Sequence, residues 1–319
     1  MFPRISVECW GFPAILSWIH SLSRRRRELT GITVLNLVLP VYNLIFAIGS
    51  MIGVGSATRY TILKAQEDDS AKKYFANAIL CILMISIPFV LSGIFSPDTV
   101  MHMMGADAGI TQLGRTYTRI FLLFTPFFMM NYVFSAFVRN DNAPTLAMIG
   151  TMMGSFSNVV LDYVFMFPMG MGLAGAALAT AASPIVSILI CSIHFFRRKI
   201  RYSLQRPDHR YGCLQHPASW GAGICGEFSS GVTTTLFNYL ILGLAGNVGV
   251  AAYGVIANFA LIFTCIFNGI SQGAQPLVSR YYGEGNERAV KKILHLGLAT
   301  GVVFSLLIIS LVWGFTDRW

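Results

Sequence analysis

The sequence predicts an all-α polytopic membrane protein. Of its 319 residues, 55% are hydrophobic and only 12% are charged, and the mean hydropathy is +0.62. The apolar residues gather into eight stretches, each near the length of about 20 residues that crosses a bilayer as a helix. These stretches are long and lack polar alternation, which favours helices over the strands of a membrane barrel.

The predicted spans follow one another from the N-terminus with polar connections between them. They run over 31–55, 75–96, 117–138, 144–167, 171–196, 220–246, 248–275 and 293–315. Residues 1–30 form an atypical N-terminal segment, because the apolar run 9–22 is too short to span and is followed, rather than preceded, by basic residues. The six cysteines show no paired metal spacing, and we expect them to pack as small apolar residues.

The basic residues predict the orientation of the spans. If the first span runs from outside to inside, the loops at 56–74, 139–143, 197–219 and 276–292 are cytoplasmic and hold fifteen Lys and Arg, against three outside. Arg24 to Arg27 run against this assignment, since they precede a span that should begin outside. Orientation therefore explains the net charge of +9, and no nucleic-acid partner is expected.

Asp162 is one of two carboxylates that lie within the predicted spans. A charged group inside a membrane is unfavourable, and such residues commonly have a function. A carboxylate at the centre of a spanning helix costs roughly 2.5 to 3.5 kcal/mol on insertion scales. Asn158 precedes Asp162 by four residues, so both side chains share one helix face and can point into one cavity. The alternative is structural, because amide and carboxyl groups also join neighbouring membrane helices by hydrogen bonds.

Glu227 is the second carboxylate, and it begins a polar face on an otherwise apolar, glycine-rich span. Ser230, Thr234 and Asn238 follow it at helical spacing. Such a face is expected to line a cavity.

Two stretches separated by about 220 residues, a length typical of a duplicated multi-helix unit, share the same order of features. In the first, Gly49 and Gly53 end an apolar span and precede Arg59-Tyr60 and an acidic cluster. In the second, Gly269 and Gly273 precede Arg280-Tyr281 and another acidic cluster. The repeat predicts two homologous lobes with equal numbers of helices.

Three blocks of the sequence together resemble the multidrug and toxic compound extrusion family, cation-coupled drug antiporters built from two six-helix lobes. They are Arg139 through Ala143-Pro144 to Asp162, the small-residue run Gly172 to Thr180, and Gly273-Ala-Gln-Pro276 leading to Tyr282-Gly-Glu-Gly-Asn286. The resemblance implies that 31–196 is the N-terminal lobe (family helices 2 to 6), 197–219 a basic cytoplasmic linker, and 220–319 a partial C-terminal lobe (helices 7 to 9). About eight of the twelve family helices are thus expected.

The resemblance also implies site residues. In one branch of the family the positions matching Asp162, Asn158 and Thr180 form a cation site, and a tyrosine matching Tyr117 lines the same cavity. Oxygen ligands suit a hard cation such as Na⁺, and a carboxylate partly removed from water can instead exchange a proton. In a second branch a coupling glutamate matches Glu227, and we expect Thr234 and Asn238 to line the cavity beside it.

The implied function is a Na⁺- or H⁺-coupled antiporter that exports organic, often cationic, drugs across the cell membrane, among membrane lipids and without a cofactor. An enzyme is not expected, since the sequence lacks a His-Glu-x-x-His motif, a Gly-x-Ser-x-Gly motif and a phosphate-binding glycine loop. One alternative is an inactive truncated fragment of such a transporter, because residues 1–30 place no acidic residue in a plausible span. The other is a lipid-linked oligosaccharide flippase of a related superfamily, although flippases usually line their cavity with cationic residues and these spans have almost none.

Overall fold

The structure, a computed structural model, describes residues 26–68, 70–104, 106, 108–197, 240 and 263–316, and the regular secondary structure within these ranges is entirely helical. The helices are α2 (Arg26–Ala65), α3 (Ala71–Phe95), α4 (Pro97–Met103), α5 (Ala108–Leu123), α6 (Thr125–Asn140), α7 (Pro144–Met166), α8 (Gly172–Arg197), an unlabelled helix at 263–283, and α10 (Glu287–Thr316). Five of these are long and apolar enough to cross a membrane, and the bent pair α5 and α6 makes up to six. The predicted all-α membrane class is confirmed.

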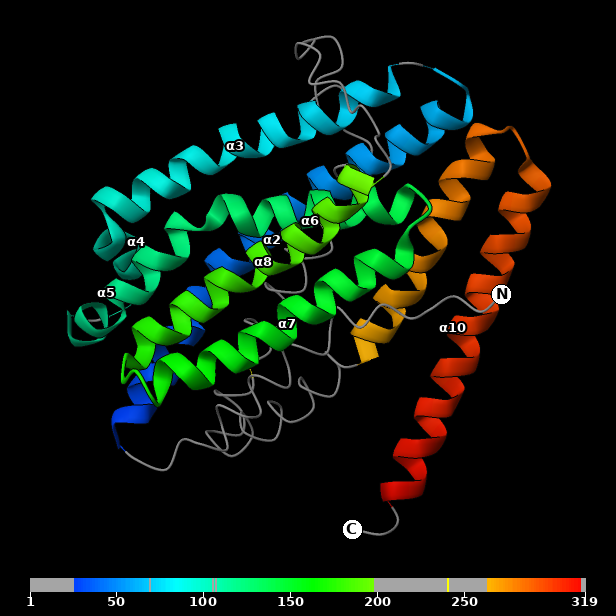
Figure 1. Cartoon of the computed structure of the whole chain (residues 1–319). Helices are drawn as coiled ribbons and strands as arrows, with labels where there is room; N and C mark the ends of the chain where they lie inside the picture. The colour runs from blue at the N-terminus through cyan, green and yellow to red at the C-terminus, as the bar shows by residue number, and fades with distance from the viewer. Residues whose placement is uncertain are drawn as a thin grey trace.

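The bundle formed by α2 to α8 is built around the packing of α2 on α6 (Figure 1). Two glycines of α2 allow the close approach. A Cβ atom added to Gly49 would lie 3.0 Å from Cα of Met129, and one added to Gly53 would lie 2.9 Å from the carbonyl carbon of Tyr132. The contacts advance in the same direction along both helices, so α2 and α6 run parallel. Fully buried side chains, such as Ile52 of α2, fill the core beside this contact.

The span predicted at 117–138 is a bent pair of helices rather than one straight helix. α5 and α6 meet at Phe124 with an angle of 43° between them. Pro126 lies in the first turn of α6, where it cannot donate a backbone hydrogen bond into α5 and so favours the break. The pair begins at Ala108, earlier than predicted, because α5 is amphipathic and its polar face hides it from a hydropathy window.

Two of the loops predicted on the cytoplasmic side, 56–74 and 276–292, are largely helical. α2 continues to Ala65, well into the predicted loop at 56–74. The helix at 263–283 and α10 occupy most of the predicted loop at 276–292, and only residues 284–286 separate them. A hydropathy window detects only the apolar part of a helix, whereas the helix itself extends beyond the hydrocarbon into water. In Figure 1 these last two helices form a hairpin beside the bundle.

Candidate functional site

Asn158 and Asp162 lie on α7, one helical turn apart. Asn158 is buried, and Asp162 is half-buried. The Nδ2 atom of Asn158 and the Oδ1 atom of Asp162 are both shielded from solvent and have no hydrogen-bond partner. Neither atom makes an interhelical hydrogen bond of the kind that a purely structural role would require. The Asp162 oxygen is an acceptor that a cation or a proton could satisfy, whereas the Asn158 nitrogen is a donor that only an acceptor could satisfy.

The helix α8 brings Thr180 to the same depth as Asn158. α7 and α8 pack antiparallel, and a Cβ added to Gly154 would lie 3.0 Å from the carbonyl oxygen of Ser183. Asn158 is one turn beyond Gly154 along α7, and Thr180 is about one turn beyond Ser183 in the opposite chain direction. The half-buried Thr180 is therefore level with Asn158 across the helix pair.

Tyr117 of α5 joins this group from a third helix. Its side chain is 7% exposed, and it lies close enough to Asp162 for the two groups to interact electrostatically. Four of the predicted site residues of the N-terminal lobe are thus gathered from α5, α7 and α8.

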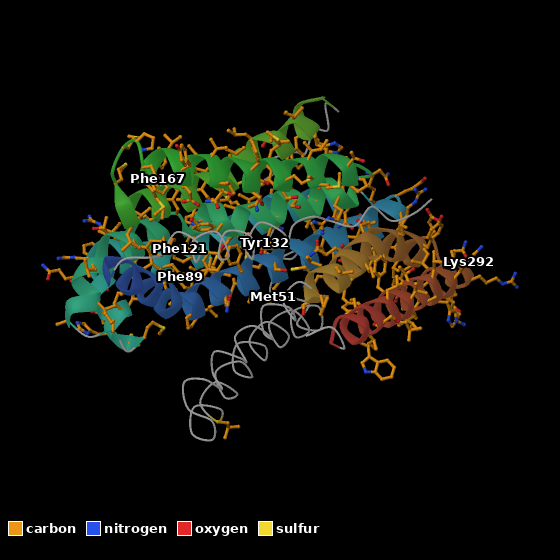
Figure 2. The ribbon with its side chains drawn as sticks, turned by 90° about the horizontal axis from the view of Figure 1, so that it is seen from below. Met51, Phe89, Phe121, Tyr132, Phe167 and Lys292 are labelled. Atoms are coloured by element: carbon orange, nitrogen blue, oxygen red, sulfur yellow. The ribbon has the colours of Figure 1, made fainter. Side chains whose placement is uncertain are left out.

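Two further tyrosines, which the sequence did not identify, belong to the same interior. Tyr42 of α2 interacts electrostatically with both Tyr117 and Tyr132 of α6. The ring of Tyr42 stacks on Phe121 at a centroid distance of 5.1 Å. Figure 2 shows Tyr132 midway along the molecule, between Phe167 at one end and Lys292 at the other. Tyr117 therefore lies in an interior that also contains the rings of Tyr42 and Tyr132.

The donor set fits a monovalent hard cation or a proton better than a multivalent metal. Asp162 supplies one carboxylate, while Asn158 and Thr180 offer neutral oxygens. Among the described residues there is no group of three or more His, Cys, Asp or Glu that could hold a metal ion. The unpaired Oδ1 of Asp162 is the atom best suited to receive a cation or proton.

The predicted site of the second lobe cannot be placed. Glu227, Thr234 and Asn238 lie outside the described residues.

A second polar cluster, also missed in the sequence, lies where α6 turns into α7. Asn142 adopts a left-handed conformation (φ 63°), which Asn tolerates better than most residues, and the Ala143 amide donates back to the carbonyl of Val138 at 3.2 Å. Pro144 then begins α7. This turn directs Asp141 inward, where its side chain has no exposed surface.

The Asp141 cluster, which consists of Asp141, Tyr60, Lys64 and His194, joins α2, the end of α6 and α8. The Tyr60 hydroxyl donates to Oδ1 of Asp141 at 3.0 Å, and Nε2 of His194 lies 2.7 Å from Oδ2. Lys64 forms an ion pair with Oδ1. Burial acts to raise the pKa of Asp141, but the hydrogen bonds from Lys64 and His194, the Lys64 charge and the Tyr60 hydroxyl outweigh it and hold that pKa below its ordinary value. Asp141 is therefore an ionised anchor at the predicted cytoplasmic end.

Comparison with known proteins decides the family. The sequence profile described as MatE matches residues 14–164 and 225–319, which is most of the chain. The chain belongs to the MatE family. The family resemblance indicated by the sequence motifs is thereby confirmed.

Curated relatives of this MatE chain are multidrug export proteins named MepA. The chain is 26% identical over 277 residues to MepA of Staphylococcus saprophyticus, covering 85% of this chain and 61% of the relative. It is 24% identical over 294 residues to MepA of Staphylococcus aureus strain MRSA252, covering 88% of this chain and 62% of the relative. The chain thus spans about three fifths of the length of these relatives.

Solved MATE structures share the fold. A crystal structure of MATE in complex with MaD3S superposes with a TM-score of 0.86 at 19% identity, over 99% of this chain and 73% of that one. An outward-facing multidrug resistance MATE transporter of the MOP superfamily superposes with a TM-score of 0.85 at 20% identity, over 98% of this chain and 70% of that one. As a MatE member the chain is a multi-pass membrane protein of a transporter family, which confirms that it is not an enzyme.

Proposed function

We propose that this MatE chain serves a cation-coupled antiporter that exports small organic, often cationic, molecules across the cell membrane. The names of the MepA relatives support export of several drugs. The observation that carries the proposal is the Oδ1 atom of Asp162, which is shielded from solvent and has no hydrogen-bond partner, one helical turn from Asn158. Such an oxygen can take up Na⁺ or H⁺ and release it again when its surroundings change.

The coupling follows from the position of Asp162 among three helices. Binding of a cation neutralises the carboxylate and so lowers the cost of packing α5, α7 and α8 tightly around it. A ligand shifts a conformational equilibrium by its difference in affinity between the two states. Cation entry from outside would therefore favour a state of the lobe that binds the organic molecule less well, and the aromatic surroundings of Tyr42, Tyr117 and Tyr132 suit a flat organic cation.

A vesicle transport assay tests this proposal. The chain is reconstituted into liposomes, and export of ethidium is followed while a Na⁺ or an H⁺ gradient is imposed separately. We expect Asp162→Asn to lower gradient-driven export at least about tenfold, because the neutral amide cannot exchange a cation. Glu287→Gln, at the exposed start of α10, is the matched control and should export normally. Undiminished export by Asp162→Asn would refute the role of this carboxylate.

A further inference from the structure

The two helices that carry the two copies of the sequence repeat meet at the predicted cytoplasmic end. A Cβ atom added to Gly283 would lie 2.7 Å from the carbonyl oxygen of Ile62 and 2.8 Å from Cβ of Ala65, so the helix at 263–283 touches α2 directly. Further from this end, Gln275 contacts Thr58. The contact points advance in the same direction along both helices, so the repeat copies run parallel and side by side (Figure 1).

The side chain of Gln275 is hydrogen-bonded to two helices of the first lobe. Its Nε2 donates to Oγ1 of Thr58 on α2 at 2.6 Å. Its Oε1 accepts from Nδ2 of Asn140 on α6 at 3.3 Å. These partners precede Gln275 by 217 and 135 residues, so one amide joins the second lobe to the two helices at the centre of the first.

The two partners of Gln275 are held in place by hydrogen bonds within the first lobe. Thr58 Oγ1 donates to the carbonyl of Val54 at 2.8 Å, and Asn140 is bonded both to the carbonyl of Ala136 at 2.8 Å and to Thr61 Oγ1 at 3.0 Å. Asn140 also directly precedes Asp141 in the chain. The partners of Gln275 therefore keep their positions whether or not Gln275 is bonded to them.

The bonds of Gln275 differ in strength from those of the Asp141 cluster. The Asp141 cluster lies within the first lobe and includes an ion pair, and charge-assisted hydrogen bonds are roughly twice as strong as neutral ones. The bonds of Gln275 join neutral amides and a hydroxyl across the lobes. A force that separates the lobes would break the neutral contact first and leave the first lobe intact.

We propose that Gln275 is a positioning residue that latches the two lobes together at the cytoplasmic end and releases them once per transport cycle. This inference rests on the proposed transport function, because alternating access requires one lobe to rock against the other. With Gln275 bonded to Thr58 and Asn140, the cytoplasmic ends of the repeat helices are held closed. Release of the amide frees the helix at 263–283 to move away from α2 and opens the cytoplasmic end between the lobes.

The test is a distance measurement between the lobes in the full 319-residue chain. Spin labels are attached through unnatural amino acids at two exposed sites, Gln66 after α2 and Arg288 at the start of α10, and the distance distribution is recorded in lipid nanodiscs. We expect Gln275→Met, which keeps the length but removes the hydrogen bonds, to raise the ratio of open to closed molecules roughly two- to tenfold for each bond lost. Thr58→Val removes one bond from the other side and should give a smaller shift in the same direction.

Gln272 provides the matched control, since it is the same residue type one turn away on the same helix and its Oε1 has no hydrogen-bond partner. Gln272→Met should leave the distance distribution unchanged. The latch is refuted if Gln275→Met and Thr58→Val both keep the wild-type distribution, or if Gln272→Met gives the same shift as Gln275→Met. If Gln275→Met does not fold, Thr58→Val decides by itself.

The distance measurement uses neither substrate nor an ion gradient, so its result is independent of the transport assay. If the distance shift is observed but the chain exports nothing, the latch proposal stands and the proposed function is refuted. A chain that exports ethidium while Gln275→Met stays closed would retain the function and refute the latch.

Discussion

Nε2 of His194 donates a 2.7 Å hydrogen bond to Oδ2 of Asp141, which lies 53 residues earlier in the chain. The donor assignment follows from the carboxylate, which when ionised only accepts hydrogen bonds. His194 is near the end of α8, and Asp141 caps the end of α6. This single bond therefore ties α8 to the end of α6, at the turn that leads into α7.

Removing the imidazole should destabilise the first lobe. In His194→Leu the buried Oδ2 of Asp141 loses this hydrogen bond, and a hydrogen bond to a charged group contributes roughly 1.5 to 3 kcal/mol. We expect the free energy of unfolding, measured in detergent by chemical denaturation, to fall by about that amount. Ile193→Leu, at the exposed neighbouring position, is the control and should change it little. Equal stability of His194→Leu and wild type would mean that the bond contributes nothing.

Because Asp141 is ionised in the folded chain, we expect its contribution to folding stability to depend on pH. Its pKa in the folded chain is held below the ordinary value, because the bonds from Lys64, His194 and Tyr60 outweigh the effect of burial. A carboxylate of this kind contributes stability that is present above its unfolded pKa of about 3.9 and is lost as pH falls through the lower folded pKa. The stability difference between wild type and Asp141→Asn should therefore be present at pH 5 and shrink towards pH 3.

Thermal unfolding of both proteins in detergent at pH 5, 4 and 3 measures this difference. Glu287→Gln, with its carboxylate exposed at the start of α10, is the control for general acid effects and should track wild type across the series. A difference that grows as the pH falls would contradict the assignment of Asp141 as an ionised anchor.

The sequence predicted those site residues whose relative positions depend only on their spacing along one helix. Asn158 and Asp162 are four residues apart in an apolar helix, so their shared face and their cost in a bilayer follow from helix geometry. In the structure both lie on α7 one turn apart, and a buried atom of each has no hydrogen-bond partner. The position of Thr180 opposite Asn158 also follows from a short connection between two antiparallel helices.

What the sequence did not predict depends on packing between distant segments. Nothing in the neighbourhood of Tyr42 distinguishes it from a tyrosine at the lipid interface, and only the close approach of α2 to α6 brings it near Tyr132. Asp141 lies in a polar turn that any hydropathy analysis assigns to a solvated loop. Its burial results from the left-handed turn at Asn142 and from side chains of α2 and α8, which no local pattern relates to it.

The close approach of Gly283 to α2 allows the contact between the repeat helices to be tested by a substitution. A methyl group added there would lie 2.7 Å from the carbonyl oxygen of Ile62, which is closer than van der Waals contact and involves backbone that cannot rotate away. Gly283→Ala should therefore push the helix at 263–283 away from α2, even though alanine favours a helix over glycine by roughly 1 kcal/mol. We expect faster hydrogen exchange at the backbone amides of 58–65, whose helix end would lose its cover. Gly297→Ala is the matched control, because nothing lies within 4 Å of its added methyl, and it should leave exchange in 58–65 as in wild type. If both variants exchange like wild type, the close approach of Gly283 to α2 does not keep the cytoplasmic ends together, and the closed contact depends on other residues such as Gln275.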